Sequence, residues 1–161
     1  MAELELHAHL KIRPGQLEGF KKQAAECMRV AREVDTRTLR YDWFISRDGT
    51  QCEVHEAYVS SEGMIEHSHN IGEARGKLFA EFAEDHFMTF YAGVSPELFD
   101  IVEAMRKAGH VRVTWFDFFQ GLESPASAAT KPEREGSSIK AVSAAAPQWR
   151  RTEERQLNGS R

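Results

Sequence analysis

The sequence is poor in cysteine, with only Cys27 and Cys52 among its 161 residues. Two cysteines at this spacing form neither the disulfide framework of a small secreted domain nor a CxxC motif. The sequence also has no run of about 18 apolar residues, which excludes a membrane-spanning helix. We therefore expect no membrane association, and two reduced, buried thiols.

An excess of positive charge is absent as well. The formal net charge is -4, so no nucleic-acid partner is expected. The first residues, MAELELHAHLKI, alternate between charged and apolar side chains, unlike a secretory signal peptide. These features favour a cytoplasmic protein.

Alternating apolar residues predict a strand over residues 3–12, and the Arg-Pro-Gly of residues 13–15 ends it. From Gln16 the apolar spacing changes to three and four, which predicts a helix over 16–34. Two more strands, 38–46 and 51–59, flank an Asp-Gly pair, the strongest short signal for a hairpin.

The second half of the pattern repeats these signals. After a serine cap, a helix is predicted from Glu62 into the eighties, disturbed near Asn70–Gly72. A strand over 86–94 follows. Next come a helix over 95–109, with Ser95 as its cap and Gly109 at its end, and a last strand over 110–119.

This order, β-α-β-β-α-β with an added α-β, predicts an α+β, ferredoxin-like fold: an antiparallel sheet with helices on one face. The other face carries a mixture that suits neither a core nor an ordinary surface: His7, His9, Lys11, Arg40 and Phe44. A second copy of the chain packing sheet against sheet would cover it, so a homodimer is expected.

The predicted domain ends at about residue 122. Residues 123–161 lack apolar periodicity and are rich in Ser, Ala, Arg and Glu. Such a segment cannot bury enough apolar surface to offset its ordering entropy. We expect a disordered C-terminal tail there.

One short stretch, HEAYVSSEGMIEHSHNIGEARGKL (55–78), holds three histidines and therefore raises the question of a metal site. His67 and His69 are two residues apart on a predicted helix and point in different directions. His7 and His9 share a strand face, but no complete ligand set with a known spacing accompanies them. No metal site is expected.

The alternative is an acid–base site. His67 lies on the apolar side of its helix, and Glu56 and Tyr58 share a strand face with apolar Cys52 and Val54. A histidine, a carboxylate and a phenol would then converge inside an apolar layer. This pattern fits either catalysis or a hydrogen-bonded core network that only holds the helix in place.

Several of these segments resemble the antibiotic biosynthesis monooxygenase superfamily. The matching features are the strand ending in Arg-Pro-Gly, the helix carrying Phe20, TLRYDWF, Glu56-x-Tyr58, and the run HSHNIGEARGKL that contains His67. They span about residues 10–94, and more loosely reach residue 122. The resemblance implies a dimeric α+β barrel with one pocket per subunit between sheet and helices.

Some members of that superfamily oxidise phenols or quinols with O₂ and without a cofactor, and the resemblance implies this activity here. It implies His67 as the base and Glu56 as the group that orients it. The aromatic substrate would contact four further residues: Tyr58, Trp43, Asn70 and Tyr41. A non-catalytic dimer that binds a small ligand is the alternative. A haem-degrading relative is disfavoured, because Ala8, His67 and Lys77 stand where that branch has Asn, Trp and His.

Overall fold

The first strand determines where the core lies. We describe a computed structural model that covers residues 3–91 and 93–121, and in it β1 (Leu4–Ile12) alternates as the sequence predicts. Its inward side chains are all at most 5% exposed: Leu4, Leu6, Ala8, Leu10 and Ile12. This alternation gives the sheet one face that must be covered by helices.

The remaining elements follow the predicted order. They are α1 (Leu17–Val34), β2 (Thr38–Ile45), β3 (Gln51–Tyr58), α2 (Ser61–Asn70), α3 (Gly72–Glu81), β4 (Ala83–Tyr91), α4 (Pro96–Lys107) and β5 (Arg112–Phe116). None of the helices in the described part of the chain has the length and apolar character that a membrane span requires. The predicted disordered tail, 123–161, lies outside the described residues.

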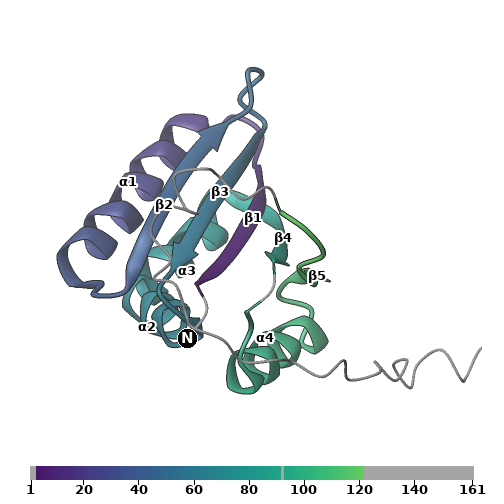
Figure 1. Ribbon diagram of the computed structural model, residues 1–161. Coiled ribbons are helices and arrows are strands. Elements are labelled where there is room, and N and C mark those ends of the chain that lie inside the picture. The colour runs from purple at the N-terminus through teal and green to yellow at the C-terminus, as the bar shows by residue number, and fades with distance from the viewer. Residues whose placement is uncertain (1–2, 92, 122–161) are drawn as a thin grey trace, which may run out of the picture. The chain divides into compact units, whose positions relative to one another are not determined.

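The strands form one sheet in the order β2-β3-β1-β4-β5, in which β1 lies between β3 and β4 (Figure 1). The first four strands pair antiparallel, as a ferredoxin-like fold requires. The added strand β5 pairs parallel to β4, because helix α4 carries the chain back across the sheet between them. The α+β, ferredoxin-like prediction is confirmed, and the sheet is mixed at this one edge.

Two strands, β4 and β5, differ most from their predicted ranges. β4 begins at Ala83, three residues before the predicted start, because its first residues pair with the end of β1. Charged Glu84 and Asp85 hide this start in the sequence pattern. β5 is shorter than predicted and ends at Phe116, and the aromatic side chains of Phe118 and Phe119 beyond it are exposed.

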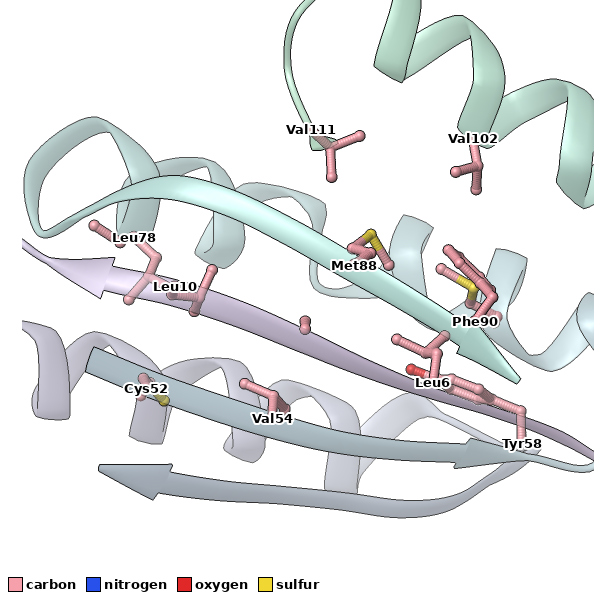
Figure 2. Close-up of a cluster of buried hydrophobic side chains, with 14 of the residues drawn as sticks. Leu6, Leu10, Cys52, Val54, Tyr58, Leu78, Met88, Phe90, Val102 and Val111 are labelled. Atoms are coloured by element: carbon pink, nitrogen blue, oxygen red, sulfur yellow. The ribbon is translucent and has the colours of Figure 1, made fainter. Parts of the chain in front are cut away.

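The core lies between the sheet and its helices. Figure 2 shows Leu10, Val54 and Met88 on one side of three neighbouring strands, together with Val102 of α4. Cys27 and Cys52 are free and buried, which confirms the expected thiols. Burial raises the pKa of Cys27 to about 11 and that of Cys52 to about 12, so both stay protonated near neutral pH.

The predicted disturbance of the second helix is confirmed as a break at Ile71. This buried residue ends α2 and begins the turn into α3, which starts at Gly72. The predicted cap at Ser95 is confirmed, since its hydroxyl accepts from the Leu98 amide at 3.2 Å. Ser60 holds the cap position of α2, but its side chain makes no capping bond there.

Candidate functional site

A small hollow lies between the sheet and the helices, with a volume of about 30 Å³. This volume holds a water-sized molecule. Apolar side chains such as Leu10, Val54 and Met88 form much of its wall. The polar and aromatic groups that face it come from β2, β3, β4, α2 and α3: Tyr41, Trp43, Glu56, His67, Arg75 and His86.

His67 is held in place by a carboxylate from the end of α1. Its Nδ1 lies 2.6 Å from Oδ2 of Asp35, and the two side chains are only 2% and 3% exposed. Thr38 donates to the same oxygen at 2.8 Å, and the Asn70 amide donates to Oδ1 at 2.9 Å. Burial acts to raise the pKa of Asp35, but hydrogen bonds from Asn70, His67 and Thr38 lower it below its usual value. Asp35 is therefore an anion near neutral pH.

The ring of His67 lines the hollow, and its other nitrogen makes no bond to Asp35. Because the Asp35 carboxylate accepts a hydrogen bond from Nδ1, the proton of the neutral ring lies on Nδ1 and Nε2 carries a lone pair. Nε2 is buried and has no hydrogen-bond partner among residues 3–91 and 93–121. A buried acceptor without a partner costs free energy, and a bound water or ligand hydroxyl would satisfy it. The site therefore presents a base to whatever occupies the hollow.

Glu56 supplies a carboxyl group that can act as a proton donor beside this base. Its side chain is buried and accepts a hydrogen bond from the Tyr58 hydroxyl at 2.6 Å. Burial raises the pKa of Glu56, while the His67 ring when it is protonated, the Tyr58 hydrogen bond and the Arg75 charge act in the opposite direction. A carboxyl with a raised pKa can hold a proton and give it up within the hollow.

The structure assigns the orienting contact to a different carboxylate than the one predicted. Asp35, and not Glu56, holds Nδ1 of His67, so that detail of the prediction is wrong. Glu56 bonds instead to Tyr58, two residues along the same face of β3. The periodic pattern of the sequence assigns side chains only within helices and strands, so it favoured Glu56 on β3. Asp35 lies in the short connection between α1 and β2.

The four residues expected to contact a substrate divide into two layers. Tyr41 and Trp43 line the hollow, and the indole Nε1 of Trp43 is a second buried polar atom without a partner in the described part of the chain. Tyr58 and Asn70 lie behind it, where they bond to Glu56 and Asp35. They position the two carboxyl groups.

Three functional groups escaped the sequence analysis: Asp35, Arg75 and His86. Arg75 continues the apolar stripe of its helices at the spacing of Ile71 and Leu78, and a cation on such a stripe was an available signal. Burial, together with the charge of Arg75, lowers the pKa of His86 to about 4, so its ring is neutral at pH 7.

The histidine pairs do not form a metal site in the described residues. His67 is buried while His69 is exposed, as expected for two residues separated by two positions on a helix. His7 instead stacks on His55, with ring centroids 3.8 Å apart. Within residues 3–91 and 93–121, no group of three His, Cys, Asp or Glu side chains is placed to hold a metal ion.

Comparison with known proteins gives structural matches only. No family model and no curated protein matches the chain by sequence. The fold is similar to that of MupZ from Pseudomonas fluorescens, with a TM-score of 0.59 and 20% identity over 78% of this chain and 98% of MupZ.

Two further matches carry an enzyme name. A "putative antibiotic biosynthesis monooxygenase" from Nitrosomonas europaea matches with a TM-score of 0.51 and 18% identity, over 58% of this chain and 92% of that protein. A protein of the same name from Caulobacter crescentus matches with a TM-score of 0.51 and 17% identity, over 58% and 90%. At these identities the matches show the fold. They confirm that this chain has a fold similar to that of proteins given this name.

Proposed function

We propose that this protein is a small monooxygenase that acts on a phenolic or quinol-type aromatic with O₂ and without a resident cofactor. The observation that carries the proposal is His67, which lines the hollow: its Nε2 is buried without a partner in the described residues while Asp35 holds Nδ1. A histidine oriented by a carboxylate is a general base of the kind that removes a hydroxyl proton near neutral pH.

The groups of the hollow suit each step of this reaction. His67 takes the proton of the aromatic hydroxyl, and the resulting electron-rich anion reacts with O₂ at a ring carbon. Glu56 gives its proton to the new peroxide. Loss of the ring-carbon hydrogen and cleavage of the O–O bond then yield a quinone and water. One oxygen atom of O₂ enters the product and the other leaves as water, so atoms and electrons balance.

The size of the hollow restricts how a substrate is held. At about 30 Å³ it accommodates a water-sized molecule, so an aromatic ring needs additional space. Two recesses adjoin it. One, of about 300 Å³, shares Tyr41 with the hollow and reaches Asp35; the other, of about 310 Å³, shares Arg75, Phe79 and His86. We infer that the ring occupies one of these recesses and directs its hydroxyl toward His67.

Support for the oxygen step comes from the structural neighbours. Two proteins with this fold are named as putative antibiotic biosynthesis monooxygenases, and this name motivates the choice of O₂ as the second substrate. The acid–base geometry alone also suits proton transfer without O₂. A non-catalytic protein that binds an aromatic ligand in the same place is the other candidate.

We further propose that the protein acts as a homodimer through the open face of the sheet. That face carries exposed Phe44 and Tyr91 and the stacked pair His7–His55. A second copy packed sheet against sheet would bury these groups.

The proposal is tested by O₂ uptake. Purified protein is treated exhaustively with a chelator and then mixed with a set of dihydroxynaphthalenes and phenols in an oxygen electrode. We expect O₂ uptake above the uncatalysed background, with one atom of ¹⁸O₂ in the quinone product. The His67→Gln variant keeps a side chain that can bond to Asp35 and should fall to background.

Each alternative gives a different result. Loss of activity on chelation would contradict cofactor independence. Turnover that proceeds equally under argon would replace the monooxygenase with an acid–base enzyme. Stoichiometric binding without turnover of any compound would favour the ligand-binding protein.

A further inference from the structure

Arg75 occupies an unusual position for a charged side chain. It lies on α3, is half-buried, and lines both the hollow and the neighbouring recess of about 310 Å³. Within the described residues the only hydrogen bond of its guanidinium is a long one, 3.5 Å, to the carbonyl oxygen of Ser68, and the group takes part in no salt bridge there. A guanidinium has five N–H donors, so most of its hydrogen-bonding capacity is unused.

The carboxylates of the recess are paired with cations that do not line it. Two carboxylates line it, Glu84 and Asp85, but each has its own cation. Glu84 pairs with Lys11 at 3.7 Å, and Asp85 pairs with Arg112 at 2.7 Å.

Arg13 adds a second guanidinium to the same recess. It donates to the carbonyl oxygens of Ala83 and Phe79, both at 3.1 Å, and thus keeps its full charge. The recess therefore contains two guanidinium groups, and its two carboxylates are already matched by cations.

We propose that this recess binds a carboxylate group of the substrate at the guanidinium of Arg75. A carboxylate is the anion that a planar guanidinium fork holds best, through two parallel hydrogen bonds. Such a ligand would supply a negative charge to pair with the half-buried guanidinium of Arg75. This inference rests on the proposed function, because it treats the bound anion as part of the molecule that reacts at His67.

The residues between the hollow and the recess suit the aromatic ring of a ligand that has a hydroxyl at one end and a carboxylate at the other. Phe79 and His86 line both cavities, and their rings lie 4.8 Å apart. The His86 ring is neutral near pH 7, so it offers an apolar face without adding charge. A hydroxylated aromatic acid can place its ring along this wall, its hydroxyl toward His67 and its carboxylate on Arg75.

A binding comparison between two matched ligands tests the proposal. 4-Hydroxybenzoate and 4-hydroxybenzamide have the same ring, hydroxyl and size, but only the first is an anion at neutral pH. Their dissociation constants are measured by calorimetry under argon, so that no oxidation occurs. We expect the acid to bind about 10- to 100-fold more tightly than the amide, the effect of one charge-assisted hydrogen-bonded pair.

Variants then assign the preference to Arg75. Arg75→Gln should bind acid and amide about equally, and Arg75→Lys should keep part of the preference because it retains the charge without the fork. Lys77→Gln removes one exposed charge from the same helix and should change neither constant. Thermal unfolding of each variant checks that it is folded.

The proposal is overturned if wild-type protein binds the amide as tightly as the acid, or if the preference survives in Arg75→Gln. The same holds if Arg75→Gln lowers turnover without changing the acid preference, because Arg75 would then act on the reacting atoms. A clear acid preference in a protein that consumes no O₂ would reject the proposed oxygen reaction and leave the carboxylate subsite standing.

Discussion

His67 on α2 and Asp35 at the end of α1 are joined by a 2.6 Å contact between Nδ1 and Oδ2, across 32 positions of the sequence. Asp35 in turn accepts hydrogen bonds from Thr38 and Asn70, so both of its oxygens are fixed. A carboxylate held in this way allows one tautomer and one orientation of the imidazole. The ring of His67, which lines the hollow, is therefore oriented before any ligand arrives.

Asp35→Asn tests this arrangement. The new amide can donate to Nδ1, which moves the ring proton to Nε2 and removes the lone pair that acts as base. We expect kcat to fall about 100-fold or more, with the fold retained. Thr38→Val removes one hydrogen bond but keeps the carboxylate, so its activity should fall less than about 10-fold. Wild-type activity in Asp35→Asn would show that His67 is not oriented by Asp35 during turnover.

Glu56→Gln tests the buried carboxyl through stability. Because the pKa of Glu56 is raised in the folded state, its favourable contribution is present below its ordinary pKa and is lost as the pH rises through the folded value. Glutamine stays neutral and can still accept from Tyr58. At about pH 8 the variant should be more stable than wild type by on the order of 1 kcal/mol, while at about pH 4 the two should match.

Thermal unfolding at the two pH values measures this difference. Glu73→Gln, on the exposed surface of α3, is the matched control and should show no such pH dependence. If Glu56 is the proton donor, Glu56→Gln also loses activity although it gains stability, a trade-off expected of a group placed for catalysis. A variant less stable than wild type at about pH 8 would mean that Glu56 is a stabilising anion.

The sequence predicted the fold well because each element carried its own local signal. Alternation in β1, three/four spacing in α1 and the Asp-Gly turn between β2 and β3 depend on neighbours within a few residues. The parallel pairing of β5 departs from the predicted antiparallel sheet and follows from the helix that connects β4 to β5. The start of β4 was predicted wrongly because its first residues include charged side chains, and only their pairing with β1 makes them part of the strand.

The candidate site was predicted less completely, for a related reason. His67 and Glu56 lie on regular elements whose faces can be assigned by counting. Asp35 lies in a connection, where no period indicates the direction of a side chain, and its partner is determined only by the tertiary structure. Arg75 keeps the spacing of Ile71 and Leu78, so counting along the helix would have placed it on the inward face as well.

Trp43→Phe tests the second unpartnered polar atom of the hollow. The indole Nε1 is buried without a hydrogen-bond partner in the described part of the chain, so removing it relieves a desolvation cost. The ring also packs edge-on against Phe20 and Tyr41, and a phenyl ring keeps part of this contact. We expect unfolding stability to stay within about 1 kcal/mol of wild type, whereas KM rises because a ligand acceptor loses its donor. An unchanged KM would place the substrate away from Trp43.

The stacked pair His7–His55 makes the proposed dimer sensitive to pH. Burial and the charge of His55 lower the pKa of His7, Arg40 adds to this, and Glu5 and Glu53 oppose it. Because the folded-state pKa is depressed, the neutral stack contributes stability above the ordinary histidine pKa, and this contribution is lost as the pH falls below it. We therefore expect a dimer at about pH 7.5 that weakens measurably at about pH 5.5.

Sedimentation equilibrium at the two pH values measures the dissociation constant. Three ion pairs also lie on this face: His9 pairs with Glu53 at 2.9 Å, Arg40 with Glu5, and Lys11 with Glu84 at 3.7 Å. His55→Phe keeps a flat ring beside His7 and removes the second charge, so the variant dimer should lose most of its pH dependence. His110→Phe, on an exposed position after α4, is the control and should behave as wild type. A monomer at both pH values would reject the dimer itself, whereas a dimer that is equally strong at both would show that the interface leaves this histidine pair unburied.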